Sequence, residues 1–301
     1  MRRTGILAFV AVPVALTAGA YFLMPTDSAQ SPAKPPVSAA QLAREEAKER
    51  AETERAADEK MIASLPPGLA APAKKELALQ ITATAEFSSL NWRLGYGSVE
   101  DNGDGCGYTA GIIGFCTGTH DLLALVERYT EKHPDNGLAR YLPALRAVDG
   151  TDSHEGLDPG FPAAWKAESK KPAFRTAQDK ERDRVYFNPA VRLAKLDGLG
   201  TLGQFVYYDA MVLHGPDPSP NGFYGLRERA LREAKLPSKG GSEKAYLDIF
   251  LDIRKQAMQR KKSTADTSRI DTAQREWLDN GNMELRTPLA WRLYGDRYQV
   301  S

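Results

Sequence analysis

Apolar residues recur at helical spacing in one segment after another of this chain. An early helix is predicted from Pro72, which suits a first helical turn, with Leu77, Ile81 and Ala85 on one face. The later stretches with the same spacing are DLLALVERYTEKH, FNPAVRLAKLDG, TLGQFVYYDAMVLHG, SEKAYLDIFLDIRKQAM and TAQREWLDNG. Strand signals are few and gather around residues 95–117. We therefore expect an α+β domain that is mostly helical, with one small strand-and-turn element.

The N-terminal segment has the features of a targeting sequence. Two arginines at positions 2 and 3 precede the apolar run GILAFVAVPVALTAGAYFLM, and AGA at residues 18–20 has the small-x-small form of a signal-peptidase site. The apolar run is also long enough to span a bilayer. Residues 1–25 are therefore predicted to be a signal peptide or a membrane anchor. The rest of the chain is expected to be secreted or, in the alternative, anchored and facing outside.

A linker is predicted at residues 26–64, before a single domain at residues 65–301. SAQSPAKPPVSAAQ is rich in Pro, Ser and Ala, and LAREEAKERAETERAADEK has helix formers without a sustained apolar stripe, so it is a solvated helix or a disordered spacer. The chain is 42% apolar, enough for a sizeable core. Its net charge of +1 gives no support to a nucleic-acid partner, and we expect a monomer.

The stretch VEDNGDGCGYTAG at residues 99–111 places carboxylates on a glycine-rich backbone. A calcium loop that starts at Glu100 would need a glutamate at its twelfth position, where this chain has Gly111. A dinucleotide-binding fingerprint would need an apolar strand before its glycines, and the charged VEDN precedes them here. The two cysteines and four scattered histidines make no metal-ligand pattern. No metal or cofactor is therefore expected.

Glycoside hydrolysis is the remaining chemistry that this stretch fits. It needs one protonated and one ionised carboxyl group on either side of a sugar chain. Glu86 is expected at the end of the first helix, where the helix dipole and neighbouring apolar residues favour its protonated form. Asp104 lies in a polar turn between two glycines, where it stays hydrated and charged. On spacing alone, a plain hairpin loop and a solvated glutamate explain the two residues as well.

The order of several motifs resembles the bacterial chitosanases of glycoside hydrolase family 46. The motifs are TAEFSSLNW, VEDNGDGCGYTAGIIGFCTGTHD, ERDRVYFNPAV, YYDAMVLHGP, FLDIRKQAM, DTSRIDTAQR and LAWRLYGDRY. The resemblance extends over residues 66–301. It implies a lysozyme-like fold of two lobes with a substrate cleft between them. It also implies cofactor-free endo-hydrolysis of β-1,4-linked glucosamine chains with inversion, acting on chitosan or a partially acetylated glucosamine polysaccharide.

The resemblance also assigns the catalytic roles. Glu86 matches the general acid of the family, and Asp104 matches the general base. Thr109 matches a threonine that helps to position the attacking water. Inversion implies that the two carboxyl groups lie roughly 6.5 to 9.5 Å apart, with room for that water between them.

Four further residues match supporting positions of the family. Asp121, in GTHD, matches a residue that binds a glucosamine unit on the non-reducing side. Asp209, Arg254 and Arg269 match a charged network behind the acid, in which an arginine orients the glutamate and tunes its proton affinity. The alternative is a buried ion-pair network without a catalytic role.

The chain departs from the family pattern at three places near these residues. Phe87 stands where relatives usually have Asn, and Cys106 stands where they have Arg. Between the two arginines, relatives carry acidic substrate-binding residues, whereas this chain carries the basic run Arg260, Lys261 and Lys262. Because chitosan is a polycation, basic residues would repel it. Weaker turnover, or a preference for more acetylated chains, is expected.

Two matters stay open at this level. Cys106 and Cys116 form a disulfide, as an exported protein permits, or Cys116 is buried and free and Cys106 is unpaired. The alternatives to a chitosanase are a lysozyme-like hydrolase of N-acetylated glycans, such as peptidoglycan, and a glycan-binding homologue with weakened turnover. His214 is expected to be a structural hydrogen-bonding residue.

Overall fold

The computed structural model describes residues 39–301. The predicted signal or anchor at residues 1–25 and the Pro-rich part of the linker lie outside these residues. No helix in residues 39–301 combines the length and the hydropathy that crossing a bilayer requires. Contacts divide the chain into two compact units, with the boundary between Thr53 and Glu54.

The charged part of the linker is helical. Helix α1 (Ala39–Ser64) crosses the boundary between the two units, and residues 47–57 are exposed along it. Beyond the boundary, Asp58 and Glu59 form ion pairs with Arg192, at 3.1 and 3.2 Å. The sequence predicted either a solvated helix or a disordered spacer here, and the structure shows the solvated helix.

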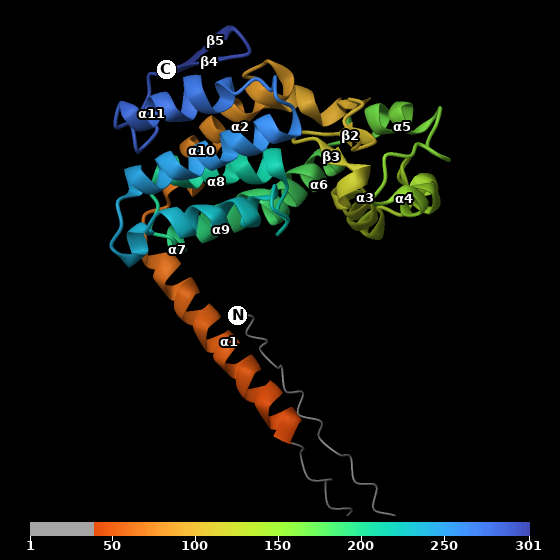
Figure 1. The fold of residues 1–301 in the computed structure, drawn as a ribbon. Coiled ribbons are helices and arrows are strands. Elements are labelled where there is room, and N and C mark those ends of the chain that lie inside the picture. The colour runs from red at the N-terminus through yellow and green to blue at the C-terminus, as the bar shows by residue number, and fades with distance from the viewer. Residues whose placement is uncertain (1–38) are drawn as a thin grey trace, which may run out of the picture. The chain divides into compact units, whose positions relative to one another are not determined.

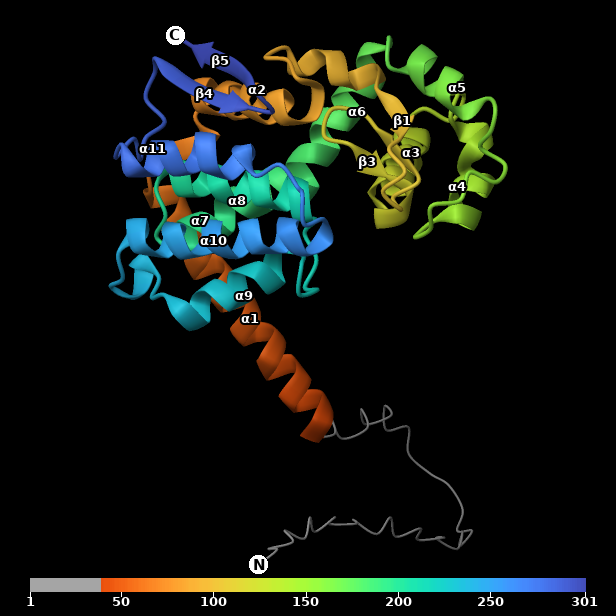
Figure 2. The ribbon, with the colours of Figure 1, turned by 45° about the horizontal axis from the view of Figure 1, so that its top comes forward.

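The larger lobe of residues 54–301 is built around a buried central helix, α8 (Thr201–His214). All residues from Thr201 to Met211 are buried, as is typical of a helix that is covered on every side. Figures 1 and 2 show α8 among the other helices of this lobe. These elements are η1 (Gly68–Ala70), α2 (Pro72–Phe87), α7 (Asn188–Leu196), α9 (Phe223–Glu233), η6 (Pro237–Lys239), α10 (Glu243–Lys261), η7 (Ile270–Gln274) and α11 (Arg275–Asp279).

The smaller lobe combines a short antiparallel sheet with helices. Its strand order is β1-β2-β3, and the register places Thr109 opposite both Glu100 and Cys116. The elements are η2 (Trp92–Gly97), β1 (Val99–Asp101), β2 (Tyr108–Ala110), β3 (Phe115–Cys116), η3 (Thr117–Thr119), α3 (Asp121–Lys132), η4 (Ala139–Tyr141), α4 (Leu142–Val148) and α5 (Phe161–Glu168). This sheet is the small strand-and-turn element expected near residues 95–117.

One long helical run joins the two lobes. Helix α6 (Pro172–Arg182) passes through the π turn η5 (Asp183–Phe187) into α7. Figure 2 shows α6 reaching from the smaller lobe towards the larger one.

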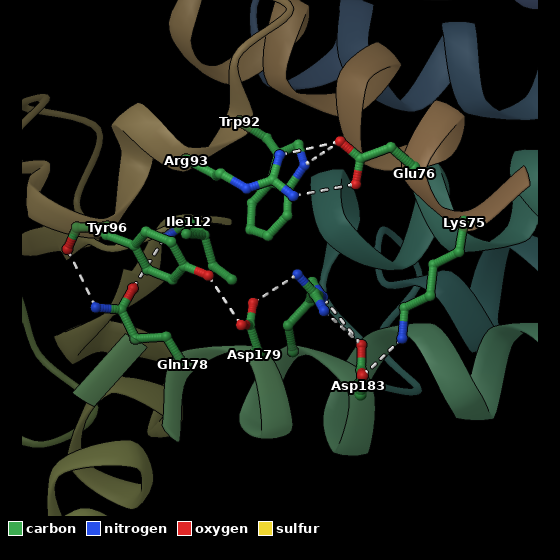
Figure 3. Close-up of polar contacts among 10 residues, drawn as sticks. Lys75, Glu76, Trp92, Arg93, Tyr96, Ile112, Gln178, Asp179 and Asp183 are labelled. Carbon is green, nitrogen blue, oxygen red and sulfur yellow. Dashed lines mark hydrogen bonds and ion pairs between the residues drawn. The ribbon is translucent and has the colours of Figure 1, made fainter. Parts of the chain in front are cut away.

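A polar network joins the run of α6 and η5 to α2, to η2 and to the loop that follows β2 (Figure 3). The amide of Gln178 accepts from Ile112 N at 3.2 Å and donates to Tyr96 O at 3.1 Å, so it joins the sheet to η2. The Tyr96 hydroxyl donates to Asp179 at 2.8 Å. Lys75 of α2 donates to Asp183 at 2.7 Å. Helix α2, and with it the segment that carries Glu86, is thereby held against the run from α6 to α7.

The predicted helices correspond to α2, α3, α7, α8, α10 and the pair η7 and α11. The C-terminal hairpin of β4 (Leu289–Leu293) and β5 (Asp296–Val300) was not predicted. Its signal was present, because Leu289, Trp291 and Leu293 alternate with exposed residues in the period of a strand. The Trp291 indole donates to Thr84 of α2 at 3.0 Å, so the hairpin covers the helix that carries Glu86 in its last turn.

Candidate active site

Glu86 lies in the last turn of α2, and Ser88 ends the helix in the left-handed conformation at φ 50°. Its side chain is 25% exposed, and Arg269 Nη1 donates to Glu86 Oε1 at 2.9 Å. The carboxyl group is thus partly open to solvent and held from behind by a guanidinium. Phe87, which follows Glu86 in the chain, packs on η2. Its ring lies so close to Gly95 of η2 that a Cβ on that glycine would lie 2.5 Å from it.

The arginine beside Glu86 belongs to a buried ion cluster. Asp209 of α8 is 1% exposed and accepts from Arg269 Nε at 2.8 Å, Arg254 Nη2 at 2.8 Å and Gln274 Nε2 at 2.6 Å. Burial alone would raise the pKa of Asp209, but the guanidiniums of Arg269 and Arg254 hold it below its ordinary value. The cluster therefore keeps Asp209 ionised, and Asp209 in turn orients Arg269 towards Glu86.

Asp104 lies on the turn between β1 and β2, in a setting unlike that of Glu86. Its side chain is 43% exposed, Cys106 N donates to Asp104 Oδ1 at 3.1 Å, and Lys261 Nζ lies 3.8 Å from Oδ2. Gly103 and Gly105 have φ values of 64° and 85°, which side chains rarely adopt. The glycines let this turn reverse sharply and present a hydrated carboxylate.

A disulfide joins this turn to the rest of the smaller lobe. Cys106 is bonded to Cys116 of β3. The backbone oxygen of Cys106 also accepts from Thr117 Oγ1 and from Gly118 N, both at 3.0 Å. Thr109, half-buried on β2, faces Cys116 in the register of the sheet. The disulfide therefore holds the turn of Asp104 beside the strand of Thr109.

Asp121 begins α3 and is buried, with its carboxylate already engaged. It accepts from Cys116 N and Thr119 Oγ1, both at 2.8 Å, and from the Tyr186 hydroxyl at 2.5 Å. Burial raises the pKa of Asp121, against these hydrogen bonds, which lower it. The backbone of Leu122 donates to Asp121 as well. These partners from the described part of the chain are all neutral, so they leave the charge of the carboxylate uncompensated.

A hollow of about 760 Å³ opens beside Asp104. One wall is the turn at residues 102–104 of the smaller lobe, and the other comes from the ends of α8 and α10 in the larger lobe. Lys261 ends α10 next to Asp104, and eight residues further along the chain Arg269 contacts Glu86. The segment from Lys261 to Arg269 thus has one end beside Asp104 and the other in contact with Glu86.

Three residues of this region make contacts that the sequence analysis did not predict. Gln274 bridges the cluster, since it donates to Asp209 and accepts from Arg254 Nη1 at 2.7 Å. Tyr294, on the turn between β4 and β5, is 48% exposed, and burial, against the charge of Arg269 and aided by that of Glu86, raises the pKa of its phenol. Lys261 was expected to repel substrate, and its proximity to Asp104 was not foreseen. All three come from segments far from their partners in the sequence.

A protein-family model for glycosyl hydrolase family 46 matches residues 80–289, which include all of the residues expected in the site. The chain belongs to glycosyl hydrolase family 46. It is therefore a glycoside hydrolase, and the resemblance drawn from the separated motifs is confirmed.

Relatives within family 46 are similar along most of their length. The chain is 52% identical to a chitosanase of Streptomyces sp. (strain N174) over 234 residues, which are 78% of this chain and 84% of the relative. It is 50% identical to a chitosanase of Nocardioides sp. (strain N106) over the same length and shares. A solved chitosanase complex structure is 50% identical, with a TM-score of 0.77 and coverage of 78% of this chain and 100% of that chain. The mostly helical α+β fold is shared with that structure.

Proposed function

We propose that this family 46 hydrolase is an endo-acting chitosanase that cleaves β-1,4 linkages between glucosamine units with inversion. The carrying observation is the pairing of two differently placed carboxyl groups. Glu86 is partly buried against Arg269, and Asp104 is exposed on a turn across the hollow from α10. The relatives named as chitosanases support the same substrate class, as does a family 46 chitosanase of Gynuella sunshinyii, 32% identical to this chain, that was solved as a complex with chitotetraose.

The two groups divide the reaction between them. Glu86 donates its proton to the glycosidic oxygen as the bond to the anomeric carbon breaks, and Arg269 stabilises the carboxylate that remains. Asp104 removes a proton from a water that attacks the opposite face of the anomeric carbon. One water is consumed, one new reducing end forms, and a β-linkage yields an α-anomer. Asp209 and Arg254 are positioning residues, because they act through Arg269.

Thr109 and Asp121 complete the proposed site. The hydroxyl of Thr109 orients the attacking water, and the sheet register that places Thr109 beside the disulfide supports this role. Asp121 binds a glucosamine ammonium. Its neutral partners support this role, because a buried carboxylate without a cation gains from a positive ligand.

We propose that the enzyme acts outside the cytoplasm as a monomer. The apolar run and small-x-small site in residues 1–25 would direct export. A disulfide next to the proposed base supports an oxidising compartment, because such bonds are rare in the cytosol. Size-exclusion chromatography with light scattering, and fractionation of producing cells, would test the two statements separately.

The proposal is tested with the purified full chain and chitosan. We expect new reducing ends together with an early fall in viscosity, which marks internal cleavage, and proton NMR should show the α-anomer first. Glu86→Gln and Asp104→Asn should each lower kcat by roughly 10²-fold to 10⁴-fold, the usual contribution of a positioned acid or base. Lys132→Gln, at an exposed position outside the hollow, is the matched control and should keep full activity.

Other outcomes would support the competing functions. Faster release of reducing ends from peptidoglycan or chitin than from any chitosan would make the chain a lysozyme-like hydrolase. Chitosan binding without release would make it a glycan-binding homologue. Unchanged hydrolysis by Glu86→Gln would show that the acid is assigned to the wrong residue.

A further inference from the structure

The hollow beside Asp104 carries an unusual charge for an enzyme of a polycationic substrate. Arg260, Lys261 and Lys262 form one side of it, at the C-terminal end of α10. Among the described residues that line it, Asp104 is the only acid. Lys261 lies close to that acid, 3.8 Å from Oδ2. An ammonium group entering here would meet more positive than negative charge.

The other lining residues do not offset this charge. His214 stands at the end of α8, and burial, aided by the charges of Arg254 and Arg269, lowers its pKa to about 3. It is therefore neutral at working pH. The rest of this wall is uncharged: Leu213 on α8 and Ala257 and Met258 on α10 are apolar, and Ser219 and Asn221 add a polar hydroxyl and amide. A surface of this kind suits a neutral group that ends in a methyl.

Resting on the function proposed above, we propose that the sugar unit held between Asp104 and the end of α10 carries an N-acetyl group rather than an ammonium group. The acetamido group is uncharged, so it avoids repulsion by Lys261 and Lys262. Its methyl packs against Leu213 and Met258. The enzyme therefore prefers partly acetylated chains, with an acetylated unit at one fixed position next to the cleaved bond.

The basic residues are free to exert this effect. The side chain of Lys261 is 74% exposed and lies at 3.8 Å from its carboxylate partner, longer than a direct hydrogen bond. Arg260 contacts only the amide of Gln256 at 3.3 Å among the contacts of the described residues. These cations also sit at a helix C-terminus, where the dipole stabilises them. The helix therefore tolerates these cations although Asp104 is the one carboxylate that lines the hollow with them.

The test compares the full-length wild type with the variant Lys261→Gln/Lys262→Gln. Substrates are chitosans of equal length, one fully deacetylated and one partly acetylated. The measured quantity is the ratio of kcat/KM between the two substrates. A change in the general base affects both substrates alike, so it cancels in this ratio. The matched control is Lys132→Gln/Lys180→Gln, because both lysines are exposed, lie on α3 and α6 and do not line this hollow.

The wild type should prefer the partly acetylated chain. The double variant should gain about fivefold to tenfold in kcat/KM on the deacetylated chain, as expected for two exposed charges. The gain should shrink as salt is added, since salt screens the repulsion. Mass spectrometry of the products should find acetylated units enriched at one of the two new ends in the wild type and the control, and less so in the variant.

Two results would overturn the inference. A wild type that prefers the deacetylated chain has no acetyl-binding position of this kind. A variant whose substrate ratio and product ends equal those of the control would show that the lysines do not select the unit. A lack of hydrolysis on every chitosan would instead refute the proposed function itself, so the two failures are distinguishable.

Discussion

Removing the disulfide tests how the turn of Asp104 is held. In the variant Cys106→Ser/Cys116→Ser the turn keeps the hydrogen bonds from Thr117 and Gly118 to the backbone of residue 106. It loses the covalent link to β3. Residues 101–105 are exposed, and two glycines in them have positive φ. This segment has little else to order it.

The magnitude follows from the short loop that the bond closes. The two cysteines are 10 residues apart. For a loop of this size the chain-entropy model gives about 2.8 kcal/mol of stabilisation at 25 °C. Each kcal/mol shifts Tm by about 2 to 4 °C in a domain of this length, so we expect Tm to fall by about 6 to 11 °C. The effect on activity should appear mainly in kcat, because Asp104 becomes less well placed while the remainder of the hollow is unchanged.

Scanning calorimetry and initial rates on chitosan measure both effects in the full chain. The wild type treated with a reductant should match the variant, and the variant should not respond to the reductant. Refutation is simple: if the variant keeps both the wild-type Tm and the wild-type kcat, the link contributes neither stability nor order to the turn. A lower Tm with an unchanged kcat would leave the stability argument intact and refute the positioning argument.

Three other substitutions test the rest of the site. Asp209→Asn leaves the buried Arg254 without an anion and the buried Arg269 with Glu86 alone, so unfolding in denaturant should show a loss of about 3 to 5 kcal/mol. Because the folded state lowers the pKa of Asp209, its charge stabilises the fold at pH values above the unfolded pKa of 3.8. The wild type should lose this stability as the pH falls through and below 3.8, and the variant should not. Asp121 has a raised pKa, which makes its charge a penalty at neutral pH; Asp121→Asn should keep or raise Tm while KM for chitosan rises. In Gly111→Ala, at φ 81°, the new Cβ would lie 2.6 Å from the Gln178 amide, which should cost about 1 to 3 kcal/mol in a melt.

Much of the fold could be predicted from local patterns. The helices α2, α3, α7, α8 and α10 have apolar residues at helical spacing, and the glycine-rich turn has no helical pattern at all. Prediction failed where the signal was short. The hairpin β4–β5 has only five-residue strands, and its alternation is easily missed near a chain terminus. The helices α4, α5, α6 and α9 were also not singled out.

For the site, the sequence determined which side chains are available, and motif order determined the family. The residue types of Glu86, Asp104 and the arginines could be read directly, together with the departures at Phe87 and Cys106. The pairing of the two cysteines stayed open, because spacing alone does not place two sulfurs together. The structure has them bonded.

The resemblance implied an arginine behind the acid, but only the tertiary structure decided which charges meet. Arg269 is 183 residues from Glu86 in the chain, yet the two are in contact, and Lys261 lies beside Asp104 across the hollow. Such pairs depend on how α2, α8, α10 and the small sheet pack together. Periodicity reports which face of one helix is buried, but not which part of another segment that face meets. The acid and base could therefore be named from the sequence, while the arginine behind the acid and the lysine beside the base gained their positions only through packing.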